Sequence, residues 1–552
     1  MLSRLEAPIE PCSALPIDLR QAVTSKGYTP PLKQLPELLA LLGEADDTAT
    51  ATATALAIRR MGAAVLPDLL RAIPGSQRPQ RGRLTELIGR FAAASSPGSQ
   101  ADEAFHLLLE LLDDHDLKTQ LNAAAALGRR RCAESEAALL AALAKQPRRE
   151  LQLALIRALG KVGGGAAQAA LAQSRPASDP SALQVTDRAM LILQREQSRT
   201  HQAVIADTVP LDQPRRFWLH ARDGLEHLLA DEARELGYEQ VQVIAPGRVE
   251  MLSARPLADL WRLRLMTDAG LPMAPQSGPV EVAVASALRQ AESLLLKLTC
   301  SVSTADSGAA APVRYRIDWP EASKAQLWSM AGHLMVACPK LVNDPTLSTW
   351  DLNIHQDAGK TQIELRPKRW LDPRFSYRHG FVPAASHPTI AAALARVAAA
   401  GAGDIVWDPF VGSGSELIEC GLSAPVQGLY GTDSDPAAIS VAQGNAVTAK
   451  LQASLHLSVG DFSAYSGPQP SLIITNPPMG RRVQRGQLAE VLTRFAEHAA
   501  NTLAPGGRLV WLAPLPVRTN PIFQRHGFRP LLLQTVDMGG FPAELQHLVK
   551  SR

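Results

Sequence analysis

The stretch that decides the fold begins at Asp404 as DIVWDPFVGSGSELIE and ends at Arg482 as SLIITNPPMGRR. The apolar run 405–407 suits a short buried strand of a parallel sheet. Gly412 and Gly414 follow it and indicate a tight turn ahead of a helix, because glycine tolerates positive φ and lets a ligand approach the backbone. A strand, a glycine turn and a helix N-terminus together form a nucleotide-type binding site.

Polar residues stand at the ends of three further predicted strands. Asp433 ends the run that starts at Gly428, and Asp461 ends another strand-like run. An acidic residue after the second strand is where a ribose hydroxyl pair is usually held. The apolar strand 472–475 stops at Asn476-Pro477-Pro478-Met479, where two prolines forbid continuation of a strand or helix. The chain therefore turns sharply there and presents the amide of Asn476.

In this order, DPFVGSG, GTDSDP, GDF and NPPMG resemble a class I S-adenosylmethionine-dependent methyltransferase that modifies an exocyclic base amine. The resemblance implies a Rossmann-like α/β domain over residues 375–552, S-adenosyl-L-methionine as cofactor, and no metal. It implies catalytic roles for Asn476, Pro477, Pro478 and Met479. The Asn476 side-chain oxygen and the Pro477 carbonyl would accept the amine hydrogens, so that catalysis is mostly positioning and electrostatics. Relatives usually carry an aromatic residue where Met479 stands, and methionine packs on a base less rigidly.

The resemblance also implies a set of cofactor-binding residues. Asp408, Gly412 and Gly414 would shape the cofactor turn, Asp433 would hold the ribose, and Asp461 would contact the adenine amine. His387 is expected to line the cofactor rather than act as a base. The full set is Ser386, His387, Asp408, Phe410, Gly412, Gly414, Ser415, Asp433, Asp435, Asp461 and Asn476.

Composition sets the frame for the whole chain. Its 552 residues are enough for about three domains. A hydrophobic content of 46% and a net charge of +3 are those of a soluble globular protein, so any nucleic-acid surface must be local. The five cysteines include no C-x-x-C pair, which argues against a disulfide framework or a zinc site. Without a signal-peptide core or a membrane-length apolar run, we expect a cytoplasmic protein.

Residues 35–200 are rich in alanine, leucine and arginine at helical spacing and contain internal similarity. Gly128 in AALGRRR and Gly160 in RALGKVG lie 32 residues apart, and weaker copies occur near Gly62 and Gly89. The region resembles a HEAT-type helical solenoid, which offers a surface for a protein or RNA partner. An ordinary alanine-rich helical domain is the alternative. The basic clusters 129–131 and 148–149 indicate either phosphate contacts or a solvated helix face.

Residues 213–366 show an α+β pattern. A strand is expected at Phe217–His220, then a helix ending near Gly237, a hairpin over 241–252 and a helix over 256–265. This order resembles the ferredoxin-like segment and THUMP domain of RNA-modifying enzymes, and the resemblance implies binding of structured RNA. A generic α+β support domain is the alternative.

The stretch IELRPKRWLDPRFSYRHG, residues 363–380, interleaves basic and aromatic side chains. Cations neutralise phosphates and aromatic rings stack on unpaired bases. The stretch therefore indicates either an RNA contact or a solvated basic face.

Together these features predict a multidomain protein: a helical solenoid, an α+β THUMP-like domain and an α/β methyltransferase domain. The predicted function is methylation of guanosine N2 in tRNA or 23S-type rRNA. Two alternatives stay open. One is an adenine-N6 nucleic-acid methyltransferase, and the other is a repeat-based scaffold or RNA-binding protein with an inactive methyltransferase domain.

Overall fold

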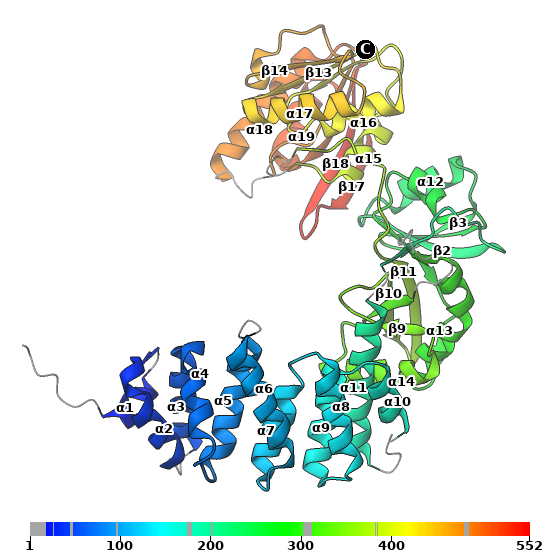
Figure 1. The fold of residues 1–552 in the computed structure, drawn as a ribbon. Helices are drawn as coiled ribbons and strands as arrows, with labels where there is room; N and C mark the ends of the chain where they lie inside the picture. The colour runs from blue at the N-terminus through cyan, green and yellow to red at the C-terminus, as the bar shows by residue number, and fades with distance from the viewer. Residues whose placement is uncertain are drawn as a thin grey trace, which may run out of the picture. The chain divides into compact units, whose positions relative to one another are not determined.

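The computed structural model describes residues 18–25, 27–44, 48–94, 98–173, 179–199, 202–301, 312–380, 382, 385–479 and 485–551. The chain divides into two compact units (Figure 1). The first contains Met1–His201 with Glu321–Asp344, and the second contains Gln202–Pro320 with Pro345–Arg552.

The first unit is built almost entirely of short amphipathic helices joined by tight turns. Its described elements are α1 Leu19–Thr24, η1 Leu32–Gln34, α2 Leu35–Glu44, α3 Thr48–Arg60, η2 Ala63–Val65, α4 Leu66–Ala72, α5 Gln80–Ala94, α6 Ser99–Glu110, η3 Leu111–Asp113, α7 Leu117–Leu127, α8 Ala133–Ala144, α9 Arg149–Val162, α10 Gly165–Gln173, α11 Pro180–Ser198, α14 Lys324–Ala337 and β9 Leu341–Asn343.

The repeated glycines of this unit lie where consecutive helices touch. Helices α5, α7, α9 and α11 pack side by side in chain order, with α6 against α5 and α8 against α9. A Cβ atom at Gly89 would lie 2.3 Å from the Ala126 Cβ, and one at Gly160 would lie 2.7 Å from the Ala189 Cα. Gly128 has the same relation to Ala158. The spacing seen in the sequence therefore marks a recurring close approach of helix backbones.

The segment Glu321–Asp344 packs with the first unit although it lies inside the 213–366 region of the sequence. Helix α14 contacts α11, where the guanidinium groups of Arg188 and Arg195 lie 4.5 and 5.0 Å from the ring of Trp328. Arg199 also pairs with the buried Asp344. Cation–aromatic contacts and a buried ion pair therefore hold this segment against the last helix of the row.

The second unit begins with an α+β segment. Its elements are β1 Ala203–Ile205, β2 Arg215–His220, α12 Glu226–Glu235, β3 Glu239–Ala245, β4 Arg248–Ser253, η4 Leu257–Arg262, β5 Asp268–Pro272, β6 Gln276–Ser277, α13 Val280–Lys297, β7 Thr299–Ser301, β8 Val313–Asp318, β10 Trp350–Asp357 and β11 Lys360–Pro367.

Seven strands of this segment form a mixed sheet in the order β3-β4-β2-β5-β11-β10-β8, the short β6 pairs with β11 off this path, and β1 and β7 form a separate ladder. The pairings are antiparallel except for β10 with β8. The helix predicted over 256–265 is wrong in type, because the chain there forms only the short 3₁₀ helix η4. Leu257 and Leu260 supply its buried face, which is too short for a full α-helical stripe.

Part of the basic and aromatic stretch 363–380 makes contacts inside the protein, while Lys368 and Arg369 are exposed. Buried Arg374 donates to the carbonyls of Leu263 and Met266, and Trp370 donates to Asp207. Tyr377 donates to Glu419, whose carboxylate also takes two hydrogen bonds of 2.7 Å from Arg264. The RNA-contact interpretation is therefore wrong for Arg374 and Tyr377, which are buried. Arg374 holds the stretch to the α+β segment, and Tyr377 holds it to helix α16, Ser415–Ser423.

The remainder of the second unit is an α/β layer structure. Besides α16 its elements are α15 Pro388–Ala398, β12 Ile405–Asp408, β13 Gly428–Asp433, α17 Pro436–Thr448, β14 Leu455–Val459, η5 Phe462–Ala464, β15 Leu472–Thr475, α18 Arg485–Thr502, β16 Arg508–Ala513, α19 Pro516–Arg525, β17 Phe528–Asp537 and β18 Pro542–Lys550.

The strand order is β14-β13-β12-β15-β16-β18-β17, with parallel pairing as far as β16 and antiparallel pairing of β17 and β18 at the edge. Every residue of β15 is buried, as expected for a central strand covered on both faces. The predicted α/β fold is confirmed. Within the described ranges, no helix combines the length and apolarity needed to cross a bilayer.

Candidate functional site

A cavity of about 670 Å³ opens at the carboxyl ends of strands β12, β13 and β15. This is where parallel α/β sheets bind ligands, and the volume is that of a small-molecule site. Most of the residues singled out in the sequence line it. They are Ser386, His387, Phe410, Gly412, Asp433, Asp435, Asp461, Asn476, Pro477, Pro478 and Met479.

The glycine turn between β12 and α16 forms one wall of the cavity. Gly412 and Gly414 have φ of +51° and +79°, which only glycine adopts without strain. Apart from its two chain neighbours, the one atom of the described residues within 4 Å of a Cβ at Gly412 would be the Phe410 carbonyl oxygen, at 3.9 Å, so the backbone there is open to a ligand. Gly414 instead packs on Ala442, and Ser415 is buried behind the wall with Asp408. Those three residues lie outside the lining and support it.

The acidic residues of the cavity hold its loops together. Asp433 Oδ2 accepts from the Gly412 amide at 2.9 Å, which fastens the glycine turn to the end of β13. Asp435 caps helix α17 through the Ala437 amide. Asp461 Oδ1 accepts from Ser463 and from Arg494, which hold the pKa of Asp461 below its usual value against the effect of its partial burial. Each carboxylate keeps further acceptor capacity, because an ionised carboxyl offers about four lone-pair positions.

A relay of three side chains fixes the amide of Asn476. Asn476 Nδ2 donates to Ser386 Oγ at 2.7 Å, and the Ser386 hydroxyl donates to buried Glu416. The serine has a single hydrogen, and that hydrogen is committed to Glu416, so its oxygen must accept from the asparagine. The amide nitrogen of Asn476 therefore faces Ser386. Its oxygen Oδ1 is buried and has no protein partner among the described residues.

Two buried carboxyl groups lie behind the glycine turn. Burial raises the pKa of Asp408, and nearby Glu416 raises it further. Burial also raises the pKa of Glu416, opposed by the hydrogen bond from Ser386 and by the charge of Arg378. Asp408 Oδ1 accepts from the Phe410 amide at 3.0 Å, which orients the first residues of the turn. Glu416 was not singled out in the sequence, although it opens the helix after the glycines.

His387 has the environment of a neutral lining residue. Burial and the positive charges of Arg222 and Arg378 lower the pKa of His387 to about 4. Its Nδ1 lies 2.7 Å from Thr389 Oγ1. Because the folded pKa is below the usual value near 6.5, folding is disfavoured progressively as the pH falls from about 6.5 towards 4.

We expect the His387 ring to stay neutral throughout the working range of an enzyme. In a histidine-labelled sample its Hε1 and Cε1 resonances should not move between about pH 5.5 and 8, while free histidine added to the same tube titrates near 6.5. Nuclear magnetic resonance spectroscopy reads both. A midpoint for His387 above about 6 would contradict the buried, cation-flanked environment.

The cavity also contains residues that sequence reasoning missed. Arg222 follows β2 of the α+β segment, and Met538 and Phe541 come from the β17–β18 turn. Arg222 Nη1 donates to the Asp537 carbonyl at 3.4 Å, and its Nε is buried with no hydrogen-bond partner among the described residues. A Cβ at Gly224 would lie 2.0 Å from the Thr535 carbonyl oxygen, so this loop sits directly on β17. No local sequence pattern predicts a contact between segments so far apart in the sequence.

The described residues contain no group of three or more His, Cys, Asp or Glu side chains arranged for a metal ion.

Comparisons with known proteins bear on residues 376–540. These residues match the family described as RMKL-like, methyltransferase domain (UPF0020). A stretch of 186 residues is 31% identical to a tRNA (guanine(10)-N2)-dimethyltransferase of Methanothermobacter thermautotrophicus, covering 32% of this chain and 49% of that protein. A stretch of 68 residues is 40% identical to the ribosomal RNA large subunit methyltransferase K/L of Chromohalobacter salexigens, covering 12% of this chain and 9% of that protein.

Among solved structures, TrmN from Thermus thermophilus is similar at a TM-score of 0.48 and 23% identity, over 61% of this chain and 99% of that one. The chain thus spans about half or less of the length of the curated relatives it matches. The match to a methyltransferase domain supports S-adenosylmethionine as the cofactor of the α/β segment.

Proposed function

We propose that this chain is an S-adenosylmethionine-dependent RNA methyltransferase that modifies N2 of guanosine in tRNA or large-subunit rRNA. The observation that supports this most is the Asn476 amide oxygen. It is buried, unpartnered among the described residues, and held at the cavity by Ser386 and Glu416. A buried acceptor without a partner is costly, and a ligand that donates a hydrogen bond relieves that cost.

The volume of the cavity and the kinds of groups that line it support binding of the cofactor. Gly412 leaves its backbone open, Phe410 supplies an apolar wall, and Asp433 and Asp461 offer acceptors for hydroxyl and amine hydrogens. When bound, S-adenosylmethionine supplies a methyl group carried on a positively charged sulfur. The glycine turn is supported from outside the cavity by Asp408, Gly414 and Ser415. The lining is completed by Ser386, His387 and Asp435.

The chemistry asked of the chain is alignment of a weak nucleophile. An exocyclic base amine is conjugated with its ring, so its lone pair must be oriented before it reacts. Asn476 Oδ1 and the Pro477 carbonyl accept one amine hydrogen each, while Pro478 keeps the loop rigid and Met479 packs on the base. The base must be unpaired or flipped out, because a paired amine does not reach the cavity.

Guanine N2 is favoured over adenine N6 by the names of the relatives. One acts by name on guanine N2 of tRNA and the other on large-subunit ribosomal RNA. Asn476 and Pro477 recognise an amine of either base, so the adenine-N6 alternative is left to experiment.

The proposed domain organisation assigns RNA binding to the THUMP-like domain and a surface for a protein or RNA partner to the helical repeats. We propose a HEAT-like repeat domain over residues 35–200, a THUMP-like domain over 213–366 and the methyltransferase domain over 375–552. The side-by-side helices with glycine contacts support the first, and the mixed sheet β3-β4-β2-β5-β11-β10-β8 is compatible with the second.

The deciding experiment is methyl transfer from labelled S-adenosylmethionine to separately purified tRNA and rRNA, followed by nucleoside mass spectrometry. N2-methylguanosine in one pool is the expected product. N6-methyladenosine would overturn the base assignment. Cofactor binding without methylation of either pool would overturn the proposed substrates, and no cofactor binding by calorimetry would favour the scaffold alternative.

A further inference from the structure

A cation follows the contact glycine in three successive repeats of the helical unit. The pairs are Gly89-Arg90, Gly128-Arg129 and Gly160-Lys161, at the carboxyl-terminal ends of α5, α7 and α9. Arg59 stands at the corresponding end of α3. Since these helices pack side by side, the cations follow one another along the same end of the row. We call Arg59, Arg90, Arg129 and Lys161 the cation ladder.

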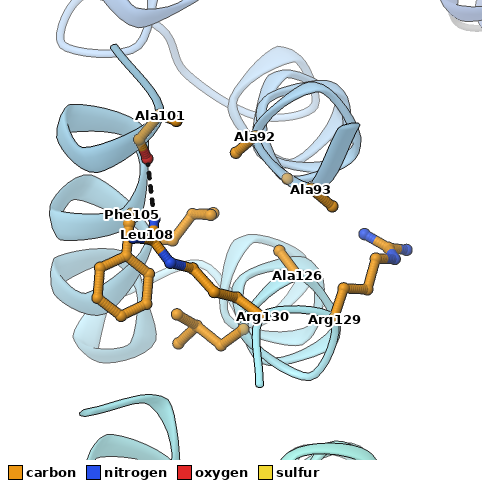
Figure 2. Close-up of a pocket in the computed structure, with 10 residues that line it drawn as sticks. Ala92, Ala93, Ala101, Phe105, Leu108, Ala126, Arg129 and Arg130 are labelled. Carbon is orange, nitrogen blue, oxygen red and sulfur yellow. Dashed lines mark hydrogen bonds between the residues drawn. The ribbon is translucent and has the colours of Figure 1, made fainter. Parts of the chain in front are cut away.

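Arg129 shows how the ladder is arranged. Its Nη1 lies 3.6 Å from the position of a Cβ at Gly89, so the Arg129 side chain extends from the end of α7 to the neighbouring helix α5. Figure 2 shows its guanidinium turned away from Arg130, which points instead to Phe105 and the Ala101 carbonyl. Arg129 and Arg130 both border a cavity of about 240 Å³, which is lined mainly by Ala92, Ala93, Ala126 and other apolar side chains.

The neighbouring basic residues are already occupied, whereas Arg129 is not. Arg130 pairs with Asp102, Arg131 with Glu196, and Arg149 with Asp179. For Arg129, Arg59 and Lys161 the described part of the chain shows no side-chain hydrogen bond or ion pair, although the charge of Glu86 acts on Arg129. Arg90 pairs with Glu86. Partial burial and the like charges of Arg90 and Arg59 also lower the pKa of Arg129, which indicates that the ladder cations repel one another.

We propose that the cation ladder is a phosphate-binding track for the RNA substrate, with the apolar cavity beside Arg129 receiving one unpaired base. The proposal rests on the proposed RNA methyltransferase function and names the surface that holds the RNA outside the catalytic cavity. Neighbouring helices lie about 8–10 Å apart, which is close to the Debye length of about 8 Å at physiological salt. The fields of adjacent ladder cations therefore add along the row, and a polyanion relieves their mutual repulsion.

The chain offers a matched pair of double variants for the test. Arg129→Gln with Lys161→Gln removes two ladder charges at the ends of α7 and α9. Lys118→Gln with Arg148→Gln removes two exposed charges at the beginnings of the same helices. The two ends are roughly 16–20 Å apart, from a rise of about 1.5 Å per residue. Both double variants lower the net charge by two, so any difference in their RNA binding comes from the positions of the removed charges.

Binding of a fluorescein-labelled tRNA transcript and a labelled rRNA fragment to the full chain is measured by anisotropy over a series of salt concentrations. We expect the ladder variant to bind its preferred RNA about tenfold more weakly, with the slope of log affinity against log salt reduced by about 1.5 for two lost contacts. The variant from the opposite ends should bind like the parent. Circular dichroism and Tm confirm that all three chains fold alike.

Equal weakening of RNA binding by both variants would overturn the proposal, because the RNA would then respond only to the net charge of the chain. Unchanged RNA binding in both variants would also overturn it, and an acidic protein would become the expected partner of the cation ladder. The methylation assay keeps this separate from the proposed function. Loss of RNA affinity in the ladder variant supports the ladder even if the parent methylates no RNA. Conversely, if the parent methylates RNA and the two variants bind that RNA with equal affinity, the proposed function stands and the cation ladder is refuted.

Discussion

Replacing Asn476 with alanine is expected to lower kcat for methyl transfer by about 10²- to 10³-fold, the usual effect of deleting one preorganised group that stabilises a transition state. The substitution removes the one side-chain acceptor that the proposed mechanism assigns to the target amine. It leaves the glycine turn, Asp433 and Asp461 in place. The Kd for S-adenosylmethionine, measured by calorimetry, should therefore stay close to that of the parent chain.

The matched control is Asn501→Ala, the same substitution at an exposed position of helix α18. It should change neither kcat nor cofactor affinity. Parent-like turnover by the Asn476→Ala variant would refute the assigned role of Asn476. A parallel loss of cofactor binding would show instead that Asn476 holds the cofactor, and the amine acceptor would then have to be sought elsewhere in the cavity.

The features of this protein that could be predicted are those determined by residues close together in the sequence. The strand predicted over 472–475 is β15, and the glycines of the first turn have the positive φ that the motif required. The repeated Gly128 and Gly160 were visible because a close helix contact recurs once per repeat. Local backbone constraints of this kind leave a local signal in the sequence.

The parts that were missed depend on long-range packing. Arg222 reaches the cavity from a segment that precedes the glycine turn by some 190 positions, and nothing in its neighbourhood marks it. The stretch around Arg374 was misread because basic and aromatic residues at an internal junction have the same composition as an RNA surface. Internal hydrogen bonds, such as those that the Leu263 and Met266 carbonyls accept from Arg374, distinguish the two cases. Glu416 was missed because a glutamate at a helix N-terminus is ordinarily explained by the helix dipole.

Glu416 has a second consequence, because the orientation of Asn476 depends on which partner donates in the relay. While Glu416 is ionised, it can only accept, so Ser386 donates to it and accepts from Asn476. A protonated or amide side chain at 416 can donate to Ser386 instead. The serine hydrogen is then released towards Asn476, and the asparagine amide turns its nitrogen to the cavity where an acceptor is needed.

Glu416→Gln is therefore expected to lower kcat by about 10- to 100-fold, while KM for S-adenosylmethionine changes little, because the fault lies in orientation and not in binding. The pH profile separates this from a structural defect. Burial raises the pKa of Glu416, so parent activity should fall as the pH drops through that raised pKa. The glutamine variant cannot titrate at 416, so its residual activity should lack this acid limb.

Two further variants complete the test of the relay. Ser386→Ala breaks it at its centre and should match the loss seen with Glu416→Gln, whereas the exposed Glu490→Gln should leave kcat unchanged. If the three side chains act as one unit, the double variant Ser386→Ala with Glu416→Gln loses no more activity than the more damaging single change. Additive losses, or an acid limb that persists in Glu416→Gln, would mean that Glu416 only packs the start of α16 and that Asn476 is oriented by something other than this relay.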